Sequence, residues 1–171
     1  ADHQNKPDVG TQLANQWFDV DKVDMVIDVP NSGVALAVSA VAAAKNKLFI
    51  VSGAAASDLT GAKCNANTIH WTYDTWMLAN GTGKAVVQTG GDSWFFITPN
   101  YAFGHALQRD TTQFVTSAGG KALGANIYPF PETTDFSAQL LQAKASGAFG
   151  VTYSPVYISL NNGGVPAARS R

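Results

Sequence analysis

The chain has 171 residues, of which 46% are hydrophobic and 13% are charged, and its formal net charge is −1. This composition is typical of a globular protein with a buried core and argues against a disordered chain. The nearly neutral charge gives no reason to expect nucleic acid or an anionic membrane surface as a partner. No apolar run reaches the roughly 18 residues that a membrane span needs.

Helix-like and strand-like segments alternate along most of the chain. In order, we predict a helix over 9–18, a strand over 24–29, a helix over 34–44, a strand over 47–52, an extra extended segment over 68–74, a helix over 75–87, a strand over 93–98, a helix over 102–117, a strand over 121–128, a helix over 136–145 and a strand over 148–153. The strands are short continuous apolar runs, as in parallel sheets covered by helices on both faces. The pattern therefore predicts an α/β fold.

For two of the predicted helices, the sequence also indicates which face is apolar or which residue caps the N-terminus. In the first helix, Val9, Leu13 and Trp17 recur at helical spacing and form one apolar face, with Phe18 next to it. The last helix follows Thr134 and Asp135, either of which can cap its N-terminus.

The segment 68–74 lengthens the step between the second and third strands, and we take it as a strand that crosses between two lobes. The first lobe is then predicted over 1–74 and the second over 75–153. Residues 154–171 contain turn residues and no helical period, which predicts an irregular tail. The chain starts without methionine or a signal peptide, as expected of a mature secreted protein or of an expression fragment.

Three loops that directly follow predicted strands are candidates for a binding site: 30–33, 52–58 and 98–105. In open α/β sheets, ligands bind at the carboxyl ends of the strands, where helix N-termini direct unpaired N–H groups and a positive dipole end outward. These loops therefore favour a small anion such as a carboxylate.

Each candidate residue in these loops also has a purely structural interpretation. Asn31 and Ser32 can cap the following helix without touching a ligand. Ser52 and Ser57 are ordinary turn residues as well as candidate ligand contacts. Tyr101 is a flat amphipathic side chain that suits either a ligand wall or simple packing.

Several longer stretches together resemble one family. They are DHQNKPD, DVPNSGVALAV, FIVSGAAASDLTG, HWTYDTWMLANGTGKAVV, WFFITPNYAFGHALQRD and TTDFSAQLLQAKASGA, which lie in matching order over roughly residues 1–150. The set resembles the type I periplasmic solute-binding proteins of ABC transporters, of the branched-chain amino acid (leucine/isoleucine/valine-binding) type. The resemblance implies three-layer α/β/α lobes with Rossmann-like parallel sheets, which form a two-lobed clamp that closes on a ligand in an interlobe cleft.

The resemblance also implies the residues of the binding site. A serine after a strand of the first lobe contacts the ligand in this family, and a following loop holds the ligand carboxylate through backbone N–H groups and a small hydroxyl residue. A tyrosine at the start of a second-lobe helix packs on the ligand from the other side, and aromatic residues of the crossing segment line the cleft or the hinge. The matching or adjacent positions here are Asn31, Ser32, Ala55, Ala56, Ser57, Trp71, Tyr73 and Tyr101.

The chain departs from the family's pattern in its length. Family members are roughly twice as long, and the elements they carry before Ala1 and after Gly150 do not occur here. The acidic residue that pairs with the ammonium of an amino acid ligand would lie in the part after Gly150. The resemblance thus implies an incomplete clamp, and residues 154–171 do not match the family's continuation.

The function implied is the solute-binding component of an ABC importer, located in the periplasm or outside the cytoplasm. The expected partners are a small carboxylate-bearing ligand, either an amino acid or an aromatic acid, and transiently an ABC permease. The alternative within the same fold is a ligand-sensing receptor domain. No cofactor or metal is expected, because the three histidines and Cys64, the single cysteine, are too scattered for a metal signature.

A small α/β enzyme is the alternative from another class. Ser52, His70 and Asp74 supply the residue types of a catalytic triad, but the chain has no G-x-S-x-G motif that would present the serine. The stretch 80–84, NGTGK, resembles part of a phosphate-binding loop, yet Ala85 stands where a Ser or Thr ligand to Mg²⁺ is required. We therefore expect a binding protein rather than an enzyme.

Overall fold

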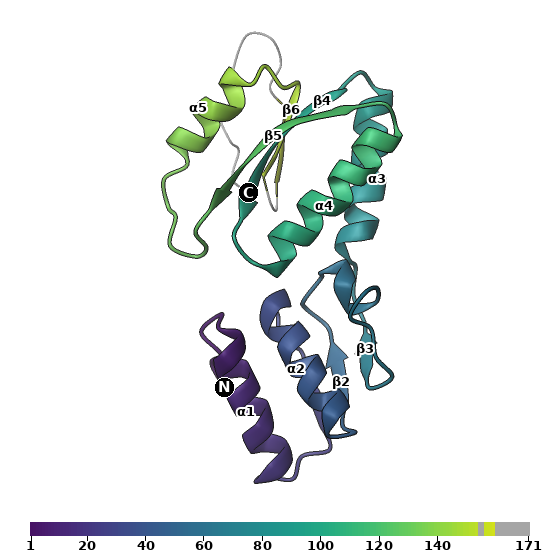
Figure 1. The fold of residues 1–171 in the computed structure, drawn as a ribbon, viewed down its shortest axis with the longest axis vertical. Helices are drawn as coiled ribbons and strands as arrows, with labels where there is room; N and C mark the ends of the chain where they lie inside the picture. Colours follow the sequence, from purple (N-terminus) through teal and green to yellow (C-terminus); the bar gives the residue numbers. More distant parts are fainter. Residues whose placement is uncertain (154–155, 160–171) are drawn as a thin grey trace. The chain divides into compact units, whose positions relative to one another are not determined.

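The computed structural model describes residues 1–153 and 156–159. The chain divides into two compact units, Ala1–Thr75 and Trp76–Arg171, and each contains one sheet with helices packed on it (Figure 1). The division falls one residue from the boundary that the sequence suggests between the lobes.

The first unit is built from two helices and a parallel sheet. Its strands pair in chain order, β1-β2-β3, and every pairing is parallel. The segment expected to cross between lobes thus begins as the third strand of this sheet. The elements are α1 (Pro7–Asp19), β1 (Met25–Ile27), α2 (Ser32–Ala44), β2 (Leu48–Val51), the short 3₁₀ helix η1 (Ser57–Leu59) and β3 (Thr68–His70).

The α1–α2 contact is made by small residues. Gly10 and Ala14 are buried where α1 meets α2, and a Cβ atom at Gly10 would collide with the Val34 side chain. Leu13 and Trp17, which the sequence places at the centre of the apolar face, are only partly buried. The predicted face of α1 was therefore rotated by about one residue, because the closest helix approach uses the smallest side chains rather than the largest.

The core of the first unit lies between the two helices and one face of the sheet. The largest buried residue of the sheet is Phe49, which is fully buried together with Val51 on the same strand. Val26 of β1 joins them, and Phe18 of α1 and Val38 of α2 pack against this face. The alternation of buried and exposed positions along β1 is the pattern of a strand covered on one side.

The other face of this sheet is apolar and uncovered. The pairing register places Met25 beside Leu48 and Ile27 beside Ile50, and Ile50 beside Ile69. Ile27 is 60% exposed, and Met25, Leu48 and Ile69 are also exposed. We call these five residues the bare face. The predicted three-layer arrangement is therefore not complete in the first unit, where the described residues form two layers.

The second unit has a sheet of order β5-β4-β6-β7. Strand β4 pairs in parallel with β5 and β6, whereas β7 is antiparallel to β6. Part of the segment expected to be irregular is thus a strand, while residues 154–155 and 160–171 lie outside the described residues. The elements are α3 (Thr75–Gln88), β4 (Ser93–Pro99), α4 (Ala102–Ser117), β5 (Lys121–Tyr128), α5 (Ser137–Ala145), β6 (Gly150–Tyr153) and β7 (Val156–Ser159).

Strand β4 is covered on both faces. Trp94 and Phe96 pack with Val115 of α4 and with residues of α3 on one side. Phe95 and Ile97 pack on the other side with α5. The indole N–H of Trp94 donates to the Gly91 carbonyl at 2.8 Å, so that the buried ring has no unpaired donor. The second unit therefore has the three layers that the sequence predicts.

The N-cap position of α5 is Phe136, so neither Thr134 nor Asp135 is the N-cap residue, but Asp135 lies one residue before it and binds the first helical residue. The Asp135 Oδ1 accepts hydrogen bonds from the Ser137 backbone N–H at 2.9 Å and from the Ser137 hydroxyl at 2.6 Å. Because these bonds favour the ionised form, they hold the pKa of Asp135 below its ordinary value.

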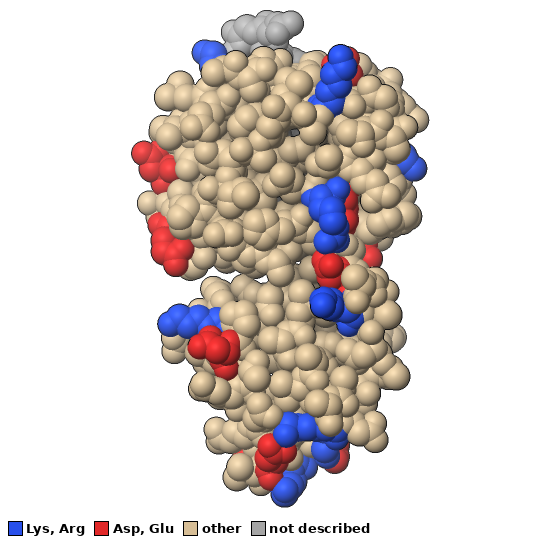
Figure 2. Space-filling model, viewed as in Figure 1, with Lys and Arg blue, Asp and Glu red and all other residues tan. Residues whose placement is uncertain are grey.

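Charge is sparse on the surface. Figure 2 shows Lys and Arg interspersed with Asp and Glu on one face, without a large patch of either sign. Within the residues that the structure describes, no helix combines the length and apolar character needed to span a bilayer. The same residues contain no group of three or more His, Cys, Asp or Glu side chains placed to hold a metal ion.

Candidate functional site

The loop that follows β1 has a strained backbone. Asp28 and Val29 have φ values of 77° and 70°, in the left-handed region, directly before Pro30. Such a conformation costs on the order of 1–3 kcal/mol for each residue, and it is least favourable for a β-branched one. The Asp28 N–H donates to the Ile50 carbonyl at 2.9 Å, and the Asp28 carboxylate accepts from the Ser52 hydroxyl at 3.2 Å. These bonds to the next strand hold the strained turn in place.

Asn31 is the N-cap of α2. Its Oδ1 accepts from the N–H groups of Gly33 at 2.9 Å and of Val34 at 3.1 Å. Its Nδ2 donates to the Asn5 side chain at 3.3 Å, and Asn31 is buried. Both ends of the Asn31 amide are thus engaged in the structural role that the sequence allows, and a ligand contact by Asn31 stays a prediction.

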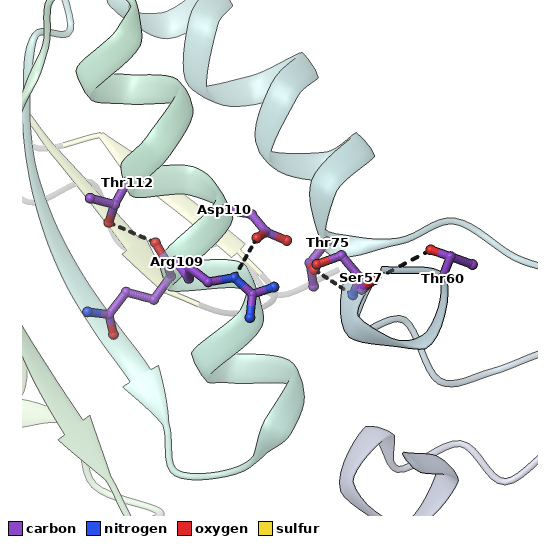
Figure 3. A network of polar contacts seen from close by, with 7 residues as sticks. Ser57, Thr60, Thr75, Arg109, Asp110 and Thr112 are labelled. Atoms are coloured by element: carbon purple, nitrogen blue, oxygen red, sulfur yellow. Dashed lines mark hydrogen bonds and ion pairs between the residues drawn. The ribbon is translucent and has the colours of Figure 1, made fainter. Parts of the chain in front are cut away.

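Ser32 joins the first candidate loop to the second. Its side chain is buried, and its Oγ accepts from the N–H groups of Ala55 at 3.3 Å and of Ala56 at 3.2 Å. The Ser57 N–H donates to Thr75 Oγ1 at 3.0 Å, as Figure 3 shows. The expectation that the loop offers these N–H groups unpaired is therefore wrong, because buried donors must be paired and neighbouring hydroxyls pair them.

The carbonyl groups of this loop are also engaged. We call Ala54–Ser57 the alanine loop. The Ala54 carbonyl accepts from His70 Nε2 at 2.7 Å, the Ala55 carbonyl accepts from the Thr75 N–H at 2.8 Å, and the Ala56 carbonyl accepts within η1 at 3.0 Å. Sequence reasoning missed this role of His70 and Thr75. The available signal was that both lie at or just beyond the end of strand β3, at the same sheet edge as the loop.

One hydrogen of this arrangement has no acceptor. Ser32 Oγ accepts two N–H groups, but among residues 1–153 and 156–159 nothing accepts the Ser32 hydroxyl proton. A hydroxyl that accepts hydrogen bonds becomes a stronger donor, because the bonds polarise one another. The Ser32 hydroxyl is therefore a stronger hydrogen-bond donor than an isolated hydroxyl, and its side chain is buried.

The aromatic residues that follow β3 project from the first unit. Trp71 is 76% exposed and Tyr73 is 49% exposed. The Trp71 N–H donates to the Val51 carbonyl at 2.7 Å, so that its backbone is fixed while its ring is not packed in the core. Such exposed rings suit a surface that contacts a ligand or another segment, and their part in a cleft or hinge stays a prediction.

Tyr101 lies at the carboxyl end of β4 in the second unit. Its ring stacks on Phe130, with 4.6 Å between centroids and 16° between planes, and Phe103 lies 6.0 Å away. The Asn100 N–H donates to the Tyr128 carbonyl at 2.9 Å and holds the ends of β4 and β5 together. Sequence reasoning missed Phe130, although it follows a strand that runs parallel to β4 and so ends at the same edge.

Figure 3 also shows polar contacts within α4. The buried Asp110 accepts from Arg109 Nε at 3.0 Å, and the Thr112 hydroxyl donates to the Gln108 carbonyl at 2.8 Å. A buried carboxylate needs such a partner because an unpaired buried charge is costly.

A cavity of about 420 Å³ lies in the first unit between α1, α2 and β1. Its walls are mainly apolar and include Trp17, Val26 and Val34, and Asp2 and Asp28 contribute polar groups. None of the ligand-binding residues predicted from the sequence lines it. The cavity is therefore separate from the Ser32 and alanine-loop arrangement.

The structure shows what Ser52, His70 and Gly83, residues of the enzyme alternatives, contact. Ser52 donates to Asp28 and His70 contacts the Ala54 carbonyl, so that the two are engaged with different partners. The glycines of the stretch 80–84 lie inside α3, where a Cβ atom at Gly83 would lie 3.4 Å from the Phe114 side chain, so that Gly83 serves helix packing.

The chain is similar to periplasmic binding proteins. A family model described as "Periplasmic binding protein" matches residues 1–164. A periplasmic binding protein from Burkholderia mallei is 46% identical, with a TM-score of 0.85 over 88% of this chain and 40% of that one. A branched-chain amino acid ABC transporter periplasmic ligand-binding protein from Burkholderia xenovorans is 39% identical, with a TM-score of 0.68 and the same coverage.

A third solved structure shares the fold at lower identity. It is an ABC transporter solute-binding protein from R. palustris in complex with benzoate, 24% identical, with a TM-score of 0.82 over 88% of this chain and 42% of that one. The comparison with curated proteins gave no match. The chain spans about 40% of the length of the solved structures it matches.

Proposed function

Because the chain belongs to the periplasmic binding protein family, we propose that it acts as the extracytoplasmic solute-binding component of an ABC importer. The family match confirms the resemblance that the sequence indicates. Members of the family that share its fold are solute-binding proteins of ABC transporters, which bind ligands rather than transform them. The partners in this proposal are a small solute in the periplasm and, transiently, a membrane permease.

The proposed ligand is a small solute that carries a carboxylate, either an amino acid or an aromatic acid. The observation that carries this proposal is the Ser32 hydroxyl, which is backed by the Ala55 and Ala56 N–H groups and has no acceptor within the described residues. A donor of this kind favours an anionic oxygen. The benzoate of the R. palustris structure supports keeping aromatic acids among the proposed ligands.

The proposed binding residues comprise one set in each unit. In the first unit, the Ser32 hydroxyl would donate to the carboxylate, with the Ala55 and Ala56 N–H groups of the alanine loop bound to its oxygen and Asn31 fixing the start of α2. Trp71 and Tyr73 would contribute aromatic surface beside them. In the second unit, Tyr101 would pack on the body of the ligand.

A thermal-shift screen of the chain tests the function. The panel contains branched-chain amino acids, other amino acids and aromatic carboxylates. A ligand at about one hundred times its dissociation constant stabilises the folded state by roughly 2.7 kcal/mol. We expect one class of carboxylate to raise the melting temperature, and no shift with any member of the panel would contradict the proposal for this chain.

Substitutions then test the residues. Ser32→Ala and Tyr101→Ala should each weaken binding of the ligand found in the screen by at least about tenfold, which corresponds to 1.4 kcal/mol. Ser117→Ala is the matched control, because Ser117 lies in α4 and its hydroxyl donates to the Phe114 carbonyl. Unchanged affinity in both test variants would refute the site while leaving the function in place.

A further inference from the structure

Strand β1 forms one edge of the sheet in the first unit. The described strands pair in the order β1-β2-β3, so that β1 has a neighbouring strand on one side only. The Asp24 carbonyl and the Asp28 N–H are hydrogen-bonded to β2. Because alternate residues of a strand direct their backbone groups to opposite sides, the N–H and carbonyl groups of Met25 and Ile27 lie on the open edge. An edge of this kind can accept a further strand.

The cavity of about 420 Å³ adjoins the same strand. Val26 and Ile27 of β1 line it, and so do Leu13 and Trp17 of α1. The apolar face that the sequence predicts for α1 therefore borders on open space rather than on a strand. The volume is roughly three times that of a cavity that holds one benzene molecule. It can thus receive several aliphatic side chains from an added segment.

The bare face lies on the other side of the same edge. Met25 and Ile27 belong to it and are 52% and 60% exposed. Successive side chains of a strand point to opposite faces of a sheet. A strand paired with β1 would therefore direct alternate side chains into the cavity beneath α1, and the others beside Met25 and Ile27. One occupant thus accounts for the open edge, the cavity and the apolar face together.

The charges around the cavity favour a basic partner. Asp2 and Asp28 both line it, and its lining among the described residues includes no Lys or Arg. The Asp28 carboxylate accepts from the hydroxyl of Ser52, which is neutral. A second copy of β1 suits the edge less well. In antiparallel pairing along the whole strand, Asp24 of each copy would lie opposite Asp28 of the other, and like charges in opposite positions are destabilising.

We propose that the open edge of β1 is a docking site for an extended peptide segment of a partner protein, apolar at alternate positions and basic near Asp2 and Asp28. The segment pairs with β1 as an added strand, which is a recurrent mode of peptide recognition. Backbone hydrogen bonds to Met25 and Ile27 hold it, and its apolar side chains fill the cavity. This inference does not rest on the proposed function, because none of the residues proposed to bind the solute lines the cavity.

Isothermal titration calorimetry of the chain with synthetic peptides tests the docking site. The probe is a short peptide with a lysine at each end and valine alternating with threonine between them. We expect saturable binding of this peptide. A control peptide with two adjacent prolines at its centre cannot pair as a strand, and should bind at least about tenfold more weakly. A peptide with glutamate in place of both lysines should bind about fivefold more weakly.

Matched substitutions place the peptide on β1 and in the cavity. Leu13→Asn makes the cavity wall polar and should weaken binding about five- to tenfold. Gln12→Asn is the control on the same helix, because Gln12 is exposed, and it should change affinity by less than about twofold. Ile27→Pro removes an N–H of the open edge and should weaken binding about tenfold, whereas Ile27→Thr keeps that N–H and should cost less than about threefold.

The outcomes that would overturn the proposal are distinct from those of the solute screen. No saturable binding of the lysine-ended peptide, or equal binding of the proline peptide, would overturn it. Unchanged affinity in Leu13→Asn and in Ile27→Pro, each shown to be folded by circular dichroism, would do so as well. Sedimentation of the chain alone tests the other occupant. A dimer that Ile27→Pro dissociates would assign the edge to a second copy and reject the peptide partner.

Discussion

The two sheets of this protein are built from similar apolar strands and are covered differently. In the second unit, four successive residues of β4, Trp94–Ile97, are buried because α3 and α4 cover one face and α5 covers the other. In the first unit, Phe49 is buried under α1 and α2, whereas Leu48 on the same strand belongs to the bare face. A continuous apolar run therefore shows only that a strand can be covered on both faces. Whether it is covered depends on the helices that pack on each face of the sheet.

The largest changes in the free energy of unfolding are expected from substitutions of successive residues in strands β4 and β2. Phe95→Ala and Phe96→Ala should each lower the free energy of unfolding by about 3–5 kcal/mol, because both rings are buried on opposite faces of β4. Phe49→Ala should cost a similar amount, but Leu48→Ala less than about 1 kcal/mol. Urea unfolding followed by tryptophan fluorescence measures these differences. A large loss from Leu48→Ala would show that the bare face is covered in solution.

Alanine substitutions of two buried glycines compare a close contact with backbone and a close contact with side chains. A Cβ atom at Gly104, in the first turn of α4, would collide with the Pro99 backbone carbonyl, whereas one at Gly10 would meet only the side chains of Val34 and Val38. We expect Gly104→Ala to lower the free energy of unfolding by about 3 kcal/mol and Gly10→Ala by about 1 kcal/mol, as measured by urea unfolding. The reason is that a backbone carbonyl can move away from a new Cβ atom less easily than a side chain can.

Gly81 in α3 is the control for both glycine substitutions, since nothing lies within 4 Å of the position that a Cβ atom would take there. Gly81→Ala should stabilise the protein by about 0.5–1 kcal/mol through helix propensity. Equal losses from Gly104→Ala and Gly10→Ala would contradict the distinction between the two contacts.

The cap of α2 is expected to contribute less. Asn31→Ala removes the acceptor for the Gly33 and Val34 N–H groups, and should cost about 1 kcal/mol in thermal or urea unfolding. Asn31→Asp keeps an acceptor oxygen and should cost less than half as much. If Asn31→Ala weakens ligand binding without changing stability, its role is in the site rather than in the fold.

The bare face should give the smallest change in stability. Ile27→Thr and Ile69→Thr should alter the free energy of unfolding by no more than about 0.5 kcal/mol, because both side chains are exposed. They should, however, reduce binding of the dye ANS and concentration-dependent light scattering, since exposed apolar patches promote association. Unchanged dye binding in the double variant would place the apolar surface elsewhere.

The sequence predicted the order and type of the elements because their periodicity is strong. The predicted strand over 121–128 and helix over 102–117 coincide with β5 and α4. The sequence could not predict which face of α1 packs, because Gly10 and Ala14 carry no hydrophobic signal yet make the closest approach to α2. It also could not place the His70 contact with Ala54, which depends on the parallel pairing of β3 with β2.

The different strand orders of the two sheets have a consequence for synthesis in the cell. In the first unit the described strands pair in chain order, β1-β2-β3, so that these pairings can form as soon as β3 has left the ribosome. In the second unit β4 acquires β5 first and must keep its other edge open until β6 follows more than twenty residues later. Contacts that close over shorter stretches of chain form faster, so the first unit should reach its native pairing early in translation, while the second waits for β6 to complete its sheet.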